Sequence, residues 1–567
     1  MERPVEPFPM QEQAEFDVAV IGSGFAGSLL AHALEASGLL VLVVERGRHP
    51  RFAIGESSTP LADLSLRRIA ARAGLTWLEP LSRFGTWQAH RPELLCGRKR
   101  GFSYVFHTPG ANAALSPDRM LHVAASSSDP DSDTQWYRPD VDRFLTERFA
   151  GTTIRYTDRT RVVSLHRDRS LWRLATSRDG ATSEFRARFL IDATGSPAFS
   201  QEFLRVKHLD SGFSTCSRAV YTHFEGLPRW RNRLEKGWKA GRAGSDERGA
   251  SAPAEAPGPF PYDPDFSALH HVLEEGWLWM LRFENDRVST GLVVDGSSRV
   301  GNPRLFEAFA EWEGAEAARK VLERYPALWE DVARTPRAAR PDSPAPLDWH
   351  VSPRLQRMAS SMQGPGWLMT PHTAGFVDPL HSTGLSHTLH GIERILNLFN
   401  PGSGDPSTPT SASRRRFDPL SPKFRTEQTL MESDLRLEFA HIDRLVAVCY
   451  ATRHDPEAFR TAAMLYFVNT IHAERARLAA PTGPVSSSLP PFLSAGNAPL
   501  RDLTRELADR ILAARPSDAS GLGRTRFDPN ELKIWAQAIR AQDPVGLFEP
   551  DPDGPDGFWR PKRVITH

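Results

Sequence analysis

A glycine-rich turn with a distant acid is the first feature of this chain whose residue types suggest chemistry. Residues 22–27 read G-x-G-x-x-G; a short apolar run leads into Gly22, and an apolar helical stretch follows to about Ser37. In such a unit the first glycine permits a tight turn, the second lets a pyrophosphate approach the backbone, and the third lets helix and strand pack closely. A second apolar run, 39–44, ends at Glu45, an acid placed to accept hydrogen bonds from ribose hydroxyls. The unit predicts a dinucleotide site, because a turn that only packs a helix on a sheet leaves Glu45 unexplained.

A proline turn at the start of a helix is the second such feature. Residues 376–384 read Phe-Val-Asp-Pro-Leu-His-Ser-Thr-Gly. Pro379 sets a rigid turn, and Ser382, Thr383 and Gly384 open a helix whose free N–H groups and dipole favour negative charge. We therefore expect these residues to face an anion.

An isolated lysine is the third. Lys99 is the only lysine between Met1 and Val206, although arginines are frequent there. A buried ammonium group can have a lowered pKa and act as an acid or a nucleophile. The alternative is a basic surface turn, because Arg98 and Arg100 flank this lysine.

Two sheets and a helical tail are expected around these residues. Apolar and alternating runs predict strands at 17–22, 39–44, 161–165, 171–176, 183–187 and 189–195, and strands of a second sheet at 214–224 and 277–294. Helical spacing follows at 61–71, 137–149, 384–399 and over much of 423–541. Residues 83–107 read as loops and short strands, and residues 240–259 as a long loop rich in Gly, Ala, Ser and Pro.

The composition excludes several classes of protein. Lysine plus arginine is 70 and aspartate plus glutamate is 69 in 567 residues, so a net charge of +1 gives no reason to expect nucleic acid or an anionic membrane. No apolar run approaches the roughly 18–20 residues of a membrane span, and the acidic, proline-broken start does not read as a signal peptide. Cys96, Cys216 and Cys449 lie far apart, which predicts no disulfide framework, no metal cluster and a reducing cytoplasm.

These patterns together resemble the flavin-dependent halogenases and the related flavin monooxygenases, over roughly residues 15–400. The resemblance implies a doubly wound α/β FAD-binding domain of the glutathione-reductase-like Rossmann type, formed by 15–208 and a return segment 346–400. It further implies an antiparallel substrate sheet at 209–345. Composition predicts a linker at 401–422, and helical spacing predicts a C-terminal helical region at 423–567. No second dinucleotide turn follows, so we expect reduced FAD from a separate flavin reductase, with transient NAD(P)H binding as the alternative.

The same resemblance assigns site residues. Residues 54–60 are similar to the segment that lines the flavin, and 191–195 to the second FAD strand. The 376–384 stretch matches the family pattern F-x-x-P-x-x-S-x-G, in which the backbone of Thr383 and Gly384 would hold a halide. Lys99 would hold hypohalous acid, and Ser382 and His381 are further catalytic candidates. The implied FAD-binding residues are Gly22, Gly24, Phe25, Ala26, Gly27, Glu45, Arg46, Glu56, Ser57, Asp192, Gly195, Phe376, Pro379 and Gly384.

Several positions depart from the family pattern. The family motif W-x-W-x-I-P, which keeps substrate away from the flavin, reads Trp277-Leu278-Trp279-Met280-Leu281-Arg282 here. Its degradation favours a monooxygenase, or Arg282 could bind an acidic group of the substrate. His381 replaces a glutamate typical of tryptophan halogenases, and Pro371-His372 replaces a Gly-Asp pair that contacts the flavin. His270 and His271 are candidates to face the substrate.

The sequence therefore predicts an FAD-dependent enzyme that uses O2 to halogenate an electron-rich aromatic, of phenol or pyrrole type, which a carrier protein could present. A hydroxylating monooxygenase on the same scaffold is the first alternative, and a flavoprotein without turnover is the second. The two enzymes differ in whether product formation requires halide and Lys99.

Overall fold

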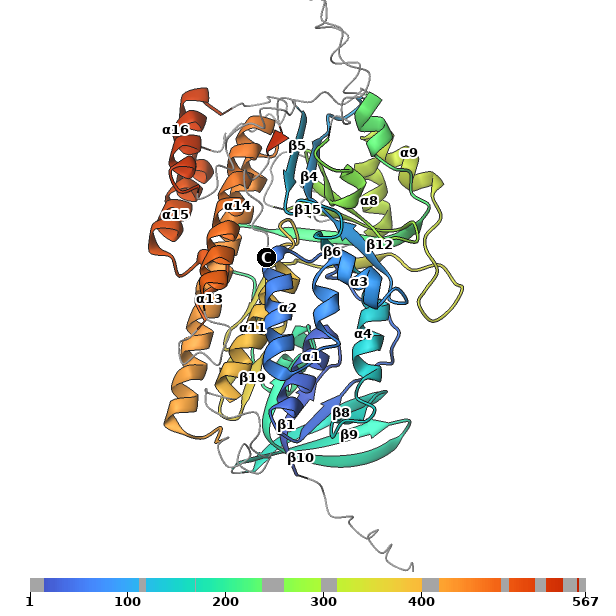
Figure 1. Cartoon of the computed structure of the whole chain (residues 1–567), viewed down its shortest axis with the longest axis vertical. Helices are drawn as coiled ribbons and strands as arrows, with labels where there is room; N and C mark the ends of the chain where they lie inside the picture. Colours follow the sequence, from blue (N-terminus) through green and yellow to red (C-terminus); the bar gives the residue numbers. More distant parts are fainter. Residues whose placement is uncertain are drawn as a thin grey trace, which may run out of the picture.

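The computed structural model describes residues 15–111, 119–168, 170–236, 260–296, 314–399, 418–480, 489–514, 527–543 and 558–559. The loop expected at 240–259 and most of the linker expected at 401–422 lie outside these residues. Figure 1 shows one sheet at the lower end of the molecule, a second sheet in its upper half, and the C-terminal helices along one side of both.

The first sheet is built from buried apolar strands, as the glycine-turn unit predicts. It has the order β18(Gln363–Gly364)–β19(Trp367–Met369)–β10(Ala181–Asp192)–β1(Glu15–Ile21)–β2(Val41–Val44)–β7(Arg155–Thr157), with β19, β10, β1, β2 and β7 parallel. Side chains of β1 alternate between two cores: Val18 and Val20 pack with α1(Phe25–Ala36) and α11(Thr383–Phe399). Ala19 and Ile21 pack on the other face with the meander β8(Thr160–Asp168)–β9(Leu171–Arg178).

One expectation for this sheet was wrong in detail. The stretches 183–187 and 189–195 predict two strands, but residues 181–192 form the single strand β10. Its first half pairs antiparallel with β9, and its second half pairs parallel with β1. The pattern changes from exposed to continuously buried along the strand because the strand leaves the meander and enters the centre of the sheet.

The second sheet is mostly antiparallel. Its order is β16(His350–Ser352)–β12(Ser217–Glu225)–β15(Arg287–Asp295)–β14(Gly276–Arg282)–β13(Ala268–Val272)–β4(Gly101–Phe106)–β5(Met120–Ala124)–β21(Phe558–Trp559). One face packs on α8(Gly314–Leu322) and α9(Pro326–Arg334), and the opposite face meets the C-terminal helices.

The C-terminal helices begin where capping residues predict. Asp455 accepts hydrogen bonds from the backbone N–H groups of Glu457 and Ala458, and Pro456 occupies the first turn of α14. The α-helices of this region, among the described residues, are α13(Pro422–Thr452), α14(Pro456–Ala479), α15(Ala498–Ala513) and α16(Pro529–Arg540). Among the described residues, no helix is long and apolar enough to cross a membrane.

Further elements connect these layers. The helices are α2(Pro60–Ala73), η1(Glu79–Ser82), α3(Phe84–His90), α4(Arg138–Glu147), α5(Pro197–Phe203), η3(Pro264–Phe266), α10(Pro371–Ala374) and η4(Phe492–Ser494). The remaining strands are β3(Cys96–Lys99), β6(Asp133–Trp136), β11(His208–Leu209), β17(Arg357–Ala359) and β20(Gly375–Phe376). Helix α3 lies in the segment expected to hold only loops and short strands.

Candidate functional site

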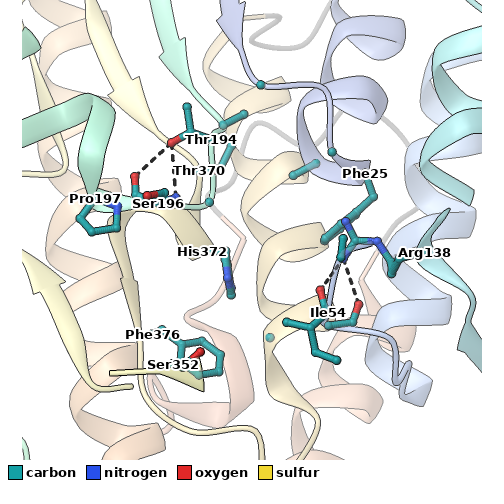
Figure 2. Close-up of a pocket in the computed structure, with 18 of the residues that line it drawn as sticks. Phe25, Ile54, Arg138, Thr194, Ser196, Pro197, Ser352, Thr370, His372 and Phe376 are labelled. Atoms are coloured by element: carbon teal, nitrogen blue, oxygen red, sulfur yellow. Dashed lines mark hydrogen bonds between the residues drawn. The ribbon is translucent and has the colours of Figure 1, made fainter. Parts of the chain in front are cut away.

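A cavity of about 820 Å³ is lined by both sheets. Figure 2 shows part of its wall, with Phe25, Ile54 and Arg138 on one side and Thr194, His372 and Phe376 on the other. The wall also contains the glycine turn, Glu45, Arg46, Glu56, Ser57, Gly195, Trp277, Trp279, Pro379, Ser382 and Gly384. The cavity therefore brings together three of the sequence features that suggested chemistry: the glycine turn, the proline turn and the tryptophan strand.

The glycines of the turn are required for different reasons. Gly22 has a φ of +101°, and a Cβ there would lie 2.7 Å from the carbonyl oxygen of Ala193. A Cβ on Gly27 would lie 2.0 Å from the carbonyl oxygen of Gly22. Gly24 borders the cavity, and the nearest atom to a Cβ placed there would be in the Arg138 guanidinium group, 3.7 Å away. The first and third glycines thus serve packing, while the second leaves the N-terminus of α1 open to an anionic group.

Glu45 is held in place at the end of β2. Its carboxylate accepts hydrogen bonds from the backbone N–H groups of Ser23 at 2.9 Å and Gly47 at 2.7 Å, and Arg51 lies 3.5 Å away. Burial raises the pKa of Glu45, but Arg51 and the two N–H donors outweigh burial, so the pKa lies below its usual value. Glu45 is therefore ionised at neutral pH and able to accept hydrogen bonds from hydroxyl groups.

Arg138 supports the cavity wall opposite, and sequence reasoning assigned it no role. Its guanidinium group donates to the carbonyl oxygens of Ile54 at 2.8 Å and Gly55 at 3.2 Å, and forms two hydrogen bonds of 2.9 Å with Asp142. It also lies 4.7 Å from the ring centre of Phe25. Arg138 thus holds the loop that carries Glu56 and Ser57 against the glycine turn.

The turn after β10 forms the next part of the wall. Asp192 does not line the cavity; its carboxylate accepts hydrogen bonds from the backbone N–H of Thr194 at 3.0 Å and its hydroxyl at 2.7 Å. Burial raises the pKa of Asp192 to about 7. Gly195, with a φ of +68°, borders the cavity. Asp192 therefore shapes the turn, and Gly195 is the residue placed to meet a ligand.

A second arginine that sequence reasoning missed braces this turn. Arg357 donates to the carbonyl oxygens of His372 at 2.6 Å, Thr373 at 2.8 Å and Gly195 at 3.2 Å. Burial lowers the pKa of Arg357 to about 10, against the opposing effect of Asp192. His372 packs against Phe376, and burial lowers its pKa to about 3, so this replacement for the family's Gly-Asp is uncharged at neutral pH.

The proline turn lies at the N-terminus of α11. Ser382 has a φ of +53°, and its hydroxyl donates to that of Ser57 at 3.1 Å. Phe376, Pro379, Ser382 and Gly384 line the cavity, whereas the side chain of Thr383 is buried at the first position of α11. The N-terminus of this helix therefore opens into the cavity at Gly384.

A buried hydrogen-bond chain connects the proline turn to the second sheet. Tyr450 donates to Asp378 at 2.8 Å, and the indole N–H of Trp277 donates to Tyr450 at 3.0 Å. Ser217 donates to the same carboxyl oxygen at 2.8 Å. Burial raises the pKa of Asp378 to about 7. These hydrogen bonds fix the position of Trp277 relative to the proline turn through Tyr450 of α13.

Lys99 is fully buried next to the cavity wall. Its ammonium group donates to the carbonyl oxygen of Ser58, the residue after Ser57, and lies 4.2 Å from the ring centre of Phe102. Burial lowers the pKa of Lys99 to about 8, against the opposing charges of Asp133 and Asp63. The alternative of a solvated basic turn is therefore wrong for Lys99, although Arg98 and Arg100 on either side form ion pairs with Asp129.

The candidate histidines differ in whether they line the cavity. His270 lines the cavity, whereas His271 points to the other face of β13, where it contacts His107 at 3.0 Å. His381 stacks on Tyr466 at 4.1 Å between ring centres and lies 3.7 Å from the Cys449 sulfur. Burial lowers the pKa of His381 to about 3, and the residue does not line the cavity.

Comparison with known proteins identifies the type of site. The family described as FAD binding domain matches residues 15–240. The chain is 26% identical over 477 residues to monodechloroaminopyrrolnitrin halogenase PrnC of Pseudomonas fluorescens, covering 82% of this chain and 73% of that protein. It is 26% identical over 380 residues to tetracycline 7-halogenase of Kitasatospora aureofaciens, covering 67% and 62%. The crystal structure of halogenase PltM shares the fold, with a TM-score of 0.74, 22% identity and coverage of 94% and 97%.

The chain is therefore similar in sequence and in fold to flavin-dependent halogenases, and residues 15–240 match an FAD-binding family. Its cofactor is FAD, and the cavity fits this group. The open backbone at Gly24 suits the pyrophosphate, ionised Glu45 suits the ribose, and the N-terminus of α11 suits the electron-rich ring system. When bound and reduced, FAD supplies the electrons that activate O2.

One expectation about the halogenase motif strand needs correction. Trp277, Trp279 and Leu281 face the cavity, but Arg282 lies on the opposite side of β14. Its guanidinium donates to the carbonyl oxygen of Leu227 at 2.7 Å and lies 3.4 Å from Asp286. Because strand side chains alternate, Arg282 cannot reach a substrate in the cavity that the tryptophans line.

Proposed function

We propose that this protein halogenates an electron-rich aromatic compound of phenol or pyrrole type, using FADH2 and O2. The observation that carries the proposal is the burial of Lys99 at the carbonyl oxygen of Ser58, on the loop that lines the flavin cavity. An ammonium group there is shielded from water and placed to donate a hydrogen bond to an oxidised halogen species that leaves the cavity.

The other residues have complementary roles in this proposal. The N-terminus of α11, at Thr383 and Gly384, holds the halide through backbone N–H groups. Trp277 and Trp279 form the wall that keeps the organic substrate out of the flavin cavity. Ser382 connects the N-terminus of α11 to Ser57 through a hydrogen bond. His381 is neutral and stacks on Tyr466, which stabilises the conformation of the proline turn.

The substrate class is supported by the names of relatives. A relative from Pseudoalteromonas luteoviolacea, 22% identical over 382 residues, is a brominase of a pyrrole-2-carbonyl group on a peptidyl-carrier protein. Halogenase PltM has been crystallised with phloroglucinol and FAD. We propose a small phenol or pyrrole as substrate, with presentation by a carrier protein, FADH2 delivery by a separate reductase and a cytoplasmic location as parts of the same hypothesis.

A single-turnover experiment tests the proposal. Enzyme loaded with FADH2 is mixed with O2, bromide and a panel of phenols and pyrroles, and the products are analysed by mass spectrometry. We expect a product with the bromine isotope doublet, which is lost in Lys99→Met and retained in the matched control Lys207→Met, an exposed lysine. If the product is instead the substrate with one added oxygen, forms without halide and is still formed by Lys99→Met, the protein is a monooxygenase.

A further inference from the structure

Two buried carboxyl groups lie beside Lys99 and have no role in the site described so far. Asp133 on β6 is directly opposite Lys99 on β3 in an antiparallel ladder, so the two side chains share one face of the ribbon. Asp63, on α2, approaches from the next layer. The exposed fractions are 0% for Lys99, 3% for Asp133 and 5% for Asp63. Three ionisable groups are thus removed from water together.

The hydrogen bonds restrict where the proton of the carboxyl pair can lie. Asp63 and Asp133 are hydrogen-bonded to each other, which requires one of them to be protonated. The backbone N–H of Thr134 donates to the Ser58 hydroxyl at 3.0 Å, and that hydroxyl donates to Oδ1 of Asp63 at 3.0 Å. Oδ1 of Asp63 is therefore an acceptor, so a proton held by Asp63 would lie on its other oxygen.

Charge and burial indicate which of the two carboxyl groups holds the proton. Burial and the neighbouring charge of Asp133 raise the pKa of Asp63 well above its usual value. Burial also raises the pKa of Asp133, but Lys99 and the hydrogen bond from Asp63 oppose this rise. Asp63 is the neutral partner, and Asp133 carries the charge that faces Lys99.

We propose that Asp63 and Asp133 are positioning residues for Lys99: sharing one proton, they present a single negative charge that keeps the Lys99 amine protonated beside the flavin cavity. The function of this charge rests on the proposed role of Lys99 in halogenation. Ser58 connects the two parts, because its carbonyl oxygen accepts from Lys99 while its hydroxyl donates to Asp63. The same residue thus fixes both the lysine and its counter-charge.

Four other titratable or charged groups surround the cluster. Arg67 of α2 interacts with both carboxyl groups, and Glu474 and Tyr466 of α14 lie near Asp133. Burial, and then the charge of Asp133, raises the pKa of Glu474 to about 7. His270 approaches Lys99 from β13, and burial keeps it neutral by lowering its pKa well below the usual value. The charge of the carboxyl pair is therefore the main favourable influence on the Lys99 ammonium group.

Removing the charge of the carboxyl pair should change the pKa of Lys99 in a known direction. An opposite charge within about 4–6 Å shifts a pKa by roughly 1–3 units. The pKa of Lys99, now about 8, should fall when the negative charge is removed, and the amine would then be neutral near pH 7. The high-pH side of the activity profile should move to lower pH in the same variant, because only the protonated amine is the cationic donor.

The decisive measurement is an NMR titration of the full chain, bound to oxidised FAD and labelled at the lysine Cε carbons. The Lys99 signal is assigned by its loss in Lys99→Met. Asp63→Asn should leave the Lys99 pKa within about 0.3 units of the wild type, because an amide at 63 replaces the carboxyl proton and Asp133 stays charged. The double variant Asp63→Asn/Asp133→Asn should lower it by about one unit or more. Asp131→Asn, an isosteric change of an exposed carboxylate two residues before Asp133, is the control and should change nothing.

Each outcome decides the proposal. An unshifted Lys99 in the double variant would refute it, and a shift in Asp63→Asn as large as in the double variant would refute the shared proton. Should the double variant not fold, Asp133→Asn alone should give a smaller fall in pKa, because the charge then moves to Asp63; no fall there would also refute the proposal. The titration needs no turnover, so it is independent of the proposed function. If the protein makes no halogenated product but shows these pKa shifts, the proposed function is refuted and the role of the carboxyl pair is not.

Discussion

The ion pair of Arg138 and Asp142 gives the sharpest test of how the cavity is built. The side chain of Asp142 is 0% exposed, so Arg138→Ala would leave a buried carboxylate without its partner. Breaking a buried pair in this way typically costs about 3–5 kcal/mol of the free energy of unfolding. The double variant Arg138→Ala/Asp142→Ala removes the stranded charge, and we expect it to recover a large part of that loss, at least about 1–2 kcal/mol.

FAD affinity should behave differently in the same variants. The hydrogen bonds from Arg138 to the carbonyl oxygens of Ile54 and Gly55 order the loop that lines the cavity, and both variants lose them. A lost hydrogen bond from a charged donor is worth about 1.5–3 kcal/mol, so we expect FAD to bind roughly ten to a hundred times more weakly in both. Stability is thus recovered in the double variant, whereas affinity is not.

The assays are urea unfolding of the apoprotein, followed by tryptophan fluorescence, and titration with FAD. Arg143→Ala on the same helix is the matched control, because its side chain is 41% exposed and its nearest carboxylate oxygens lie 3.8 Å and 4.0 Å away. We expect it to change the free energy of unfolding by less than about 0.5 kcal/mol. A double variant no more stable than Arg138→Ala, or one with wild-type FAD affinity, would refute this reasoning.

Four further substitutions test other parts of the site. Gly27→Ala should prevent correct folding of the glycine turn, since its Cβ would lie 2.0 Å from a carbonyl oxygen, whereas Gly24→Ala should fold and bind FAD more weakly; soluble yield and flavin fluorescence distinguish the two. Gly291→Ala would place a Cβ 2.1 Å from the indole ring of Trp279, so we expect a displaced tryptophan and less halogenated product per FADH2 oxidised. Tyr450→Phe removes the link between Trp277 and Asp378 and should cost about 1–3 kcal/mol of unfolding free energy, measured by urea denaturation.

Sequence reasoning succeeded where local chemistry determines structure. The glycine turn, the capping residues of α14 and the proline turn before α11 each have a short-range physical cause, and each appears where the pattern predicts it. Helix α3 was missed because its residues have weak helical preference and Gly85 interrupts them. That glycine is required by a distant contact, because a Cβ there would lie 2.8 Å from the carbonyl oxygen of Pro130.

The supporting arginines were missed for a related reason. Arg138 and Arg357 stand in a chain with many arginines, and nothing in their neighbours distinguishes them from surface residues. Their roles depend on carbonyl groups contributed by remote segments, such as Ile54 for Arg138 and Gly195 for Arg357. Lys99 was identifiable because lysine is scarce in the first part of the chain, whereas its partner Asp63 gave no comparable signal.

The altered tryptophan motif shows how a departure from a pattern depends on the face it occupies. In sequence, Arg282 in place of proline argued for a degraded barrier and hence for a monooxygenase. In the structure, the positions that face the cavity keep both tryptophans and an aliphatic residue at 281. The changed position lies on the opposite face, 3.9 Å from Asp265 and 3.4 Å from Asp286. The substitution changes the contacts on the face of β14 that points away from the cavity, and it leaves the cavity face unchanged. It therefore no longer favours hydroxylation over halogenation.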